Sequence, residues 1–162
     1  MKKILIVEDD TYILNIYSLT FRKAGFEVDE ASNGHESLTK LNTNTYDMIL
    51  LDIMLPDITG IEILTEIRKE NHKAKDTPVF LATNLGQDDI IKEAFKIGAD
   101  GYFIKGQLNP TDIVNEINLY FSQAASGAST SPVATADSQT KDTPVLVSVP
   151  PNSTLPATPT EK

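Results

Sequence analysis

Short apolar runs rich in β-branched residues recur along the chain. They lie at residues 3–7, 27–31, 47–51, 78–82 and 101–104. Apolar runs of this length are typical of strands that are buried on both faces of a sheet. The run at 27–31 instead alternates polar and apolar residues, which predicts a strand at the edge of that sheet.

Longer amphipathic stretches separate these runs. Their apolar side chains recur at helical spacing and predict helices that end near Gly25, that cover about residues 35–41, 61–67 and 90–97, and that begin at Asn109-Pro110. Gly25 and Gly98 follow two of these stretches at the position where a glycine commonly ends a helix. Strict alternation of strand and helix predicts a doubly wound (βα)5 fold of the α/β class, in which helices cover both faces of a parallel sheet.

The composition changes abruptly after Gln123. Residues 124–162 consist mainly of Ala, Ser, Thr and Pro and hold six of the nine prolines. Such a segment cannot assemble a core, so the sequence predicts a folded domain at residues 1–123 and a disordered tail at residues 124–162. Within the tail only Val145–Val149 has the character of a strand; it is either an unstructured patch or a docking peptide that adds to a partner's sheet edge.

Charge and cysteine content narrow the function classes. The chain has 162 residues and a formal net charge of −9, and residues 1–123 hold 12 Lys and Arg against 20 Asp and Glu. Because an acidic domain repels phosphate backbones, we expect no direct contact with nucleic acid. The chain has no cysteine and no apolar stretch long enough for a signal peptide or a membrane span. These features predict a soluble protein of the reducing cytoplasm that does not bind membranes.

Four of the predicted strands end in residues that suit phosphoryl chemistry. Glu8 and Asp9 follow the first strand, Asp52 the third, Thr83 the fourth and Lys105 the fifth. The carboxyl ends of parallel strands open into one crevice, where such sheets bind ligands. A carboxylate in line with phosphorus can accept a phosphoryl group, and Mg²⁺ offsets the repulsion among neighbouring carboxylates. We therefore predict that Asp52 is the nucleophile. Glu8 and Asp9 would bind the metal ion, and Lys105 and Thr83 would contact the phosphate.

Other polar residues have structural interpretations. Asp10 is expected to cap the first helix, because aspartate is a favoured N-cap residue. Asp57 and Gly60 are expected to shape the loop and begin the third helix. His35 and His72 stand in polar surroundings and are expected at the surface, with no spacing that suggests a zinc site.

The strand ends also carry a resemblance to a known family. The residues are Glu8-Asp9, Asp52 followed by Met54, Pro56 and Gly60, Thr83 after Pro78–Ala82, and the run Gly98–Lys105. In order and spacing, residues 2 to about 122 resemble the CheY-like receiver domain of bacterial two-component response regulators. The resemblance implies a flavodoxin-like sheet with the strand order 2-1-3-4-5.

The resemblance also implies a reaction and a metal site. Asp52 would accept a phosphoryl group from a histidine of a sensor kinase or of a histidine phosphotransfer protein. The resemblance assigns Mg²⁺ to Asp9, Asp52 and the backbone carbonyl of Met54, with Glu8 acting through water.

A switch follows from the same resemblance. Thr83 and Tyr102 match the pair of residues that moves on phosphorylation. Their movement would repack the face formed by the fourth helix, the fifth strand and the fifth helix. The affinity of that face for a downstream protein, or for a second copy of the chain, would then change.

The chain departs from the family at several positions. Gly106 follows Lys105 where proline is usual, so we expect a trans bond here, or a cis bond only where the surroundings enforce it. Asn84 stands where a small residue is usual, and it either narrows access to the pocket or adds a hydrogen bond. Met54 and Leu85 are apolar at rim positions, which predicts slow self-dephosphorylation because neither side chain can orient water.

The leading interpretation is a stand-alone phosphoacceptor signalling domain without an output domain, not an enzyme that acts on a diffusible substrate. A receiver-like module that signals by binding alone is a second possibility, which the presence of Asp52 and its companions disfavours. The third is a Mg²⁺-dependent phosphohydrolase. Such enzymes, resembling the haloacid dehalogenase group, have a second aspartate where this chain has Met54. Dinucleotide binding is disfavoured because no Gly-x-Gly-x-x-Gly follows the first strand.

Overall fold

The computed structural model describes residues 1–84 and 88–125. These residues form five strands and five helices in strict alternation. In chain order they are β1 Lys3–Val7, α1 Thr11–Lys23, β2 Glu27–Ala31, α2 Gly34–Thr43, β3 Met48–Asp52, α3 Gly60–Ile67, β4 Val79–Thr83, α4 Asp88–Ile97, β5 Gly101–Ile104 and α5 Pro110–Ala125. The predicted (βα)5 pattern is confirmed.

All five strands are parallel and lie in the order β2-β1-β3-β4-β5, as the resemblance implied. β3 and β4 each begin and end one residue later than the sequence predicted. Pro78 cannot donate a ladder hydrogen bond, although its carbonyl accepts one from Ile49 N. The shift makes Asp52 and Thr83 the last residues of their strands, so both lie at the carboxyl edge of the sheet.

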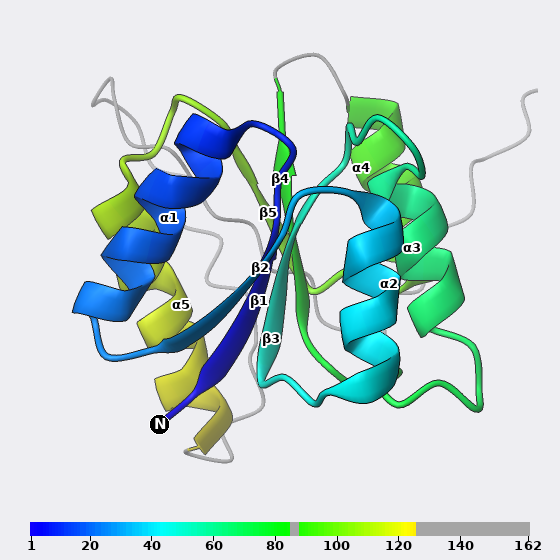
Figure 1. Ribbon diagram of the computed structural model, residues 1–162, viewed down its shortest axis with the longest axis horizontal. Helices are drawn as coiled ribbons and strands as arrows, with labels where there is room; N and C mark the ends of the chain where they lie inside the picture. Colours follow the sequence, from blue (N-terminus) through cyan, green and yellow to red (C-terminus); the bar gives the residue numbers. More distant parts are fainter. Residues whose placement is uncertain (85–87, 126–162) are drawn as a thin grey trace, which may run out of the picture.

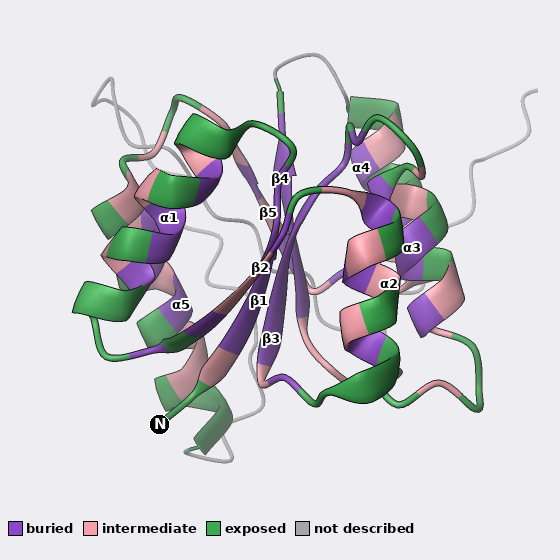
Figure 2. Cartoon of the chain, in the orientation of Figure 1, coloured by how far each residue is buried: buried purple, intermediate pink, exposed green. Residues whose placement is uncertain are grey.

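Two layers of helices cover the sheet (Figure 1). One face, which we call the α1–α5 face, packs Ile6, Leu50 and Phe103 of the strands against Tyr17 and Ile113 of these two helices. The opposite face packs against α2, α3 and α4. Because β1, β3 and β4 are covered on both faces, nearly all of their residues are buried (Figure 2).

The edge position of β2 is also confirmed. Glu27 is exposed, Asp29 and Glu30 are half-buried, and only Val28 and Ala31 are buried. Lys3 of β1 pairs with both Glu27 and Asp29, with Nζ 2.9 Å and 3.3 Å from their carboxylate oxygens. Charged side chains of this kind discourage an exposed edge from pairing with another chain.

Helix ends follow local chemistry. Asp10 caps α1, because its Oδ1 accepts hydrogen bonds from Tyr12 N and Ile13 N at 2.8 Å and 3.1 Å. Gly25 and Gly98 have φ values of +91° and +120°, which glycine tolerates and other residues rarely adopt. The helix predicted at 35–41 is longer in the structure, since the Asn33 side chain caps Gly34–Thr43 by accepting from Glu36 N.

One sequence prediction needs correction. His35 is exposed as expected, but His72 is half-buried, and its Nδ1 accepts a hydrogen bond from Ala74 N within the turn after α3. The last helix, α5, ends at Ala125, and the domain boundary at Gln123 stays a prediction. Residues 126–162, including Val145–Val149, lie outside the described residues. Among the described residues, no helix combines the length and hydrophobicity needed to span a lipid bilayer.

Candidate functional site

The carboxyl ends of β1, β3 and β5 bring together three charged side chains far apart in sequence. Lys105 Nζ lies 2.6 Å from Asp52 Oδ2 and 2.7 Å from Glu8 Oε2. The Lys105 N–H donates to Thr83 O at 2.7 Å, which extends the β5 ladder one residue beyond Ile104. These residues therefore meet at the edge of the sheet where the sequence placed them.

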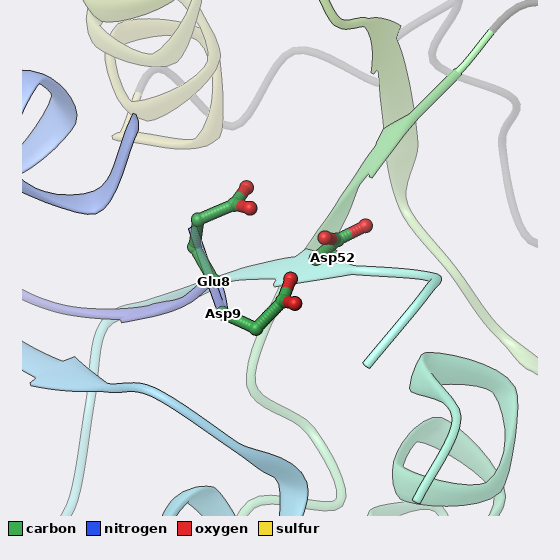
Figure 3. A group of neighbouring side chains, drawn as sticks. All are labelled: Glu8, Asp9 and Asp52. Atoms are coloured by element: carbon green, nitrogen blue, oxygen red, sulfur yellow. The ribbon is translucent and has the colours of Figure 1, made fainter. Parts of the chain in front are cut away.

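Asp9 completes an acidic group with Glu8 and Asp52 (Figure 3). One carboxylate oxygen from each residue lies within 4.8 Å of the other two, and Asp9 alone of the three is exposed. If all three are ionised, Lys105 balances one negative charge and leaves two. Carboxylate oxygens with an unbalanced charge of two fit a divalent cation such as Mg²⁺, which prefers oxygen ligands.

Burial sets the protonation of Glu8. Burial raises the pKa of Glu8 to about 7; Lys105 opposes this shift, and the charge of Asp52 adds to it. Burial alone would lower the pKa of Lys105, but its contacts with Asp52 and Glu8 raise it. Lys105 therefore stays an ammonium group at neutral pH, while Glu8 is protonated more readily than an ordinary glutamate.

The loop after β3 folds back onto the strand end. Asp52 Oδ1 accepts a hydrogen bond from Met54 N at 3.0 Å, and Gly60 N donates to Ile53 O at 2.9 Å. A Cβ atom at Gly60 would lie 2.3 Å from the carbonyl oxygen of Asp52, so only glycine fits this close approach. The Met54 backbone is thereby held beside the Asp52 carboxylate, while its side chain is exposed.

Thr83 and Tyr102 lie on neighbouring strands. The register pairs Asp52 with Ala82, which places Thr83 one residue further along the adjacent strand. Thr83 is buried, and its Oγ1 donates to Asn84 O at 3.1 Å. The half-buried Tyr102 ring meets Phe95 of α4 edge-on, with the ring centroids 6.0 Å apart.

The positions that depart from the family pattern are partly resolved. No peptide bond among the described residues is cis, so the Lys105–Gly106 bond is trans, and Gly106 has a φ of +82°. The Thr83 hydroxyl donates to the backbone carbonyl of Asn84, so this hydrogen bond does not involve the Asn84 side chain. Leu85 lies outside the described residues, and slow self-dephosphorylation stays a prediction.

Sequence reasoning misplaced Asp57. α3 begins at Gly60 as predicted, but Thr59 and not Asp57 caps it: the Thr59 side chain accepts from Glu62 N while Glu62 accepts from Thr59 N. Asp57 instead accepts from Gly34 N and His35 N of α2 at 2.8 Å and 2.9 Å. These backbone hydrogen bonds hold the pKa of Asp57 well below its ordinary value. A pattern limited to local spacing could not reveal a link between residues more than 20 positions apart.

Comparison with known proteins agrees with this geometry. The chain is 42% identical over 103 residues to the regulatory protein VanRB of Enterococcus faecalis, an alignment that covers 64% of the chain and 45% of that protein. The chain thus spans less than half the length of this relative. It resembles the crystal structure of a CheY-like receiver domain protein from Methanospirillum hungatei, with 29% identity, a TM-score of 0.71, and coverage of 79% and 99%.

A third similarity is to the DrrB receiver domain, whose solved structure is described as BeF3-activated. That match has 30% identity and a TM-score of 0.66, and covers 75% of this chain and 98% of the other. The sequence model of the response regulator receiver domain matches residues 4–118, which include every residue of the crevice described above. The chain therefore belongs to the family of response regulator receiver domains.

Proposed function

We propose that Asp52 accepts a phosphoryl group from a phosphohistidine and that the chain signals in this phosphorylated form. The observation that carries the proposal is the position of Lys105 Nζ, 2.6 Å from Asp52 and 2.7 Å from Glu8, beside an acidic group that suits a divalent cation. Phosphorylation and Mg²⁺ binding are typical of the family to which the chain belongs.

The proposed step transfers the phosphoryl group from a histidine nitrogen to an oxygen of Asp52. An oxygen of the Asp52 carboxylate attacks the phosphorus atom of the donor and forms a new O–P bond. The P–N bond of the phosphohistidine breaks, and its electron pair returns to the imidazole nitrogen. The product is an aspartyl phosphate, and Lys105 can move from the carboxylate to a phosphoryl oxygen and balance its charge.

Asp9, Asp52 and the backbone carbonyl of Met54 would hold Mg²⁺ in this reaction, and Glu8 would reach it through water. When bound, the ion offsets the charge of the carboxylates and of the phosphoryl group. The hydrogen bond from Met54 N to Asp52 supports this set, because it holds the Met54 backbone next to the carboxylate.

The response would pass through Thr83 and Tyr102. The Thr83 hydroxyl, now bonded to Asn84 O, would turn toward the phosphoryl group, and the Tyr102 ring would move away from Phe95. The α4–β5–α5 face would then change its affinity for a downstream protein or a second copy of the chain. Its upstream partner would be a cytoplasmic histidine kinase or phosphotransfer protein. We place the receiver domain at residues 1–123 and a tail at residues 124–162.

The test is phosphorylation by a small donor. The full chain is incubated with Mg²⁺ and acetyl phosphate, and its intact mass is measured. We expect one phosphoryl group on the wild type and none on Asp52→Asn. Asp89→Asn, which changes an almost fully exposed aspartate of α4, is the matched control and should react like the wild type. A wild type that gains no mass, or an Asp52→Asn variant that gains as much, would contradict the proposal.

A further inference from the structure

Tyr17 is a buried tyrosine next to the crevice that the proposed reaction does not use. It lies on α1 and is 6% exposed. Its ring meets Phe103 of β5 edge-on, with the centroids 6.2 Å apart and the planes at 85°. Because side chains two residues apart on a strand leave the same face, Phe103 and Lys105 both project from the α1–α5 face of the sheet.

The other charged groups project from this face as well. Glu8 follows Ile6, and Asp52 follows Leu50, each at a spacing of two from a residue packed on the α1–α5 face. α1 begins beside the end of β1 and runs back along the sheet (Figure 1). Since helical side chains lean toward the N-terminus of their helix, Tyr17 leans toward the crevice.

The electrostatics agree with this placement. Burial raises the pKa of the Tyr17 phenol, and the negative charge of Glu8 raises it further. The phenol therefore lies within electrostatic reach of the Glu8 carboxylate.

Both groups have unused hydrogen-bonding capacity. The Tyr17 hydroxyl makes no hydrogen bond with any of residues 1–84 and 88–125. Glu8 Oε2 is buried and forms an ion pair with Lys105, but it accepts no hydrogen bond of good geometry from those residues. The Tyr17 hydroxyl is not among the fully buried polar atoms that lack a partner, so it keeps some contact with solvent, whereas Glu8 Oε2 is buried and has Lys105 as its cationic partner.

We infer that Tyr17 is a positioning residue, whose hydroxyl donates to Glu8, directly or through one water, when Lys105 turns to the phosphoryl group. This inference rests on the proposed function, because it concerns the state in which Lys105 has left Glu8. A buried carboxylate that loses its cationic partner is destabilised unless another donor replaces it. The phenol supplies that donor and so favours the phosphorylated arrangement of the crevice.

The test compares two tyrosines of one helix. Tyr17→Phe removes the hydroxyl and keeps the ring, and Tyr12→Phe makes the same change at a side chain that is 75% exposed. Titration calorimetry on the full chain measures the affinity for Mg²⁺ alone and then for BeF3⁻ at saturating Mg²⁺, and thermal unfolding measures stability. We expect Tyr17→Phe to weaken BeF3⁻ binding by roughly 2- to 10-fold, the effect of one hydrogen bond. Its Mg²⁺ affinity and melting temperature should stay close to those of the wild type and of Tyr12→Phe.

Each other outcome is decisive. If Tyr17→Phe binds BeF3⁻ as the wild type does, the hydroxyl has no such role and the inference is wrong. If Mg²⁺ and BeF3⁻ affinities fall together with the melting temperature, Tyr17 only packs, and the inference is again overturned. Failure of the proposed function is distinct, because the wild type itself would then gain no phosphoryl group from acetyl phosphate.

Discussion

Two polar networks lie at opposite edges of the same sheet, and they differ in how completely their charges and hydrogen-bond donors are paired. At the carboxyl edge, Lys105 pairs with the buried carboxylates of Glu8 and Asp52, and the exposed Asp9 carboxylate lies close to both of them, so negative charge is in excess. At the amino edge, Arg68 lies between the segments that lead into β4 and β5. The first network carries unbalanced negative charge, whereas in the second each guanidinium nitrogen of Arg68 donates a hydrogen bond.

The Arg68 network is saturated. Arg68 Nη1 donates to the carbonyls of Ala74, Lys75 and Thr77 at 2.9 to 3.2 Å. Its Nε and Nη2 donate to Gly98 O, and Nη2 also reaches Asp100 Oδ2 at 3.1 Å. The comparison teaches that burial of charge does not by itself mark a functional site. A saturated network stabilises the fold, whereas a network with excess negative charge can still bind a cation.

Removing Arg68 should therefore produce the largest change. Arg68→Met would remove the cation that binds four backbone carbonyls and the Asp100 carboxylate, at a side chain that is only 16% exposed. Breaking a buried charged network in this way costs about 3–5 kcal/mol. We expect urea unfolding to show this loss, with Lys69→Met as the control because the Lys69 side chain is 62% exposed. If the free energy of unfolding falls by less than about 1 kcal/mol, the range of surface ion pairs, the Arg68 network does not stabilise the fold.

The pH dependence of stability separates the two networks further. Burial raises the pKa of Glu8 from 4.5 to about 7, so the folded chain binds more protons than the unfolded chain between these pH values. The stability from this group is complete below pH 4.5 and is lost as pH rises through 7. We expect unfolding free energies, measured with chelator, to fall by about 1–3 kcal/mol over this window.

Glu8→Gln is the control for that measurement, because it cannot ionise and keeps nearly the same volume. Burial raises the pKa of Asp100 too, so the wild type alone would mix both groups. The difference between wild type and Glu8→Gln isolates Glu8. Equal slopes in the two proteins would show that Glu8 does not titrate in this window.

The alternation of strands and helices was predictable because each element carries its own period. The strands β1, β3 and β4 are apolar throughout since both faces are covered, and the edge position of β2 shows in its polar alternation. The strand order, however, came from the resemblance, because periodicity does not say which strands are neighbours. The gathering of Glu8, Asp52 and Lys105 followed from the rule that parallel strands end at one edge.

The remaining contacts had no signal in the sequence for a physical reason. Arg68 and Asp57 bind mainly backbone carbonyls and N–H groups, which all residue types offer except that proline lacks the N–H. The partners are set by how the chain folds and not by which side chains they carry. Tyr17 was also missed, since a tyrosine at an apolar helical position is usually core, and only the packing on Phe103 places it beside the crevice.

Asp9→Asn should give the smallest change, and with the opposite sign. It removes one of the two excess negative charges at an exposed position, so we expect about 0.5–1 kcal/mol more stability without Mg²⁺. The wild type should gain stability when Mg²⁺ is added, whereas Asp9→Asn should gain much less. Thermal unfolding with and without Mg²⁺ measures both effects, with Asp89→Asn as the exposed control. An Asp9→Asn variant that is less stable without Mg²⁺ would mean that the carboxylates of the crevice do not repel one another, and the contrast with the Arg68 network would fail.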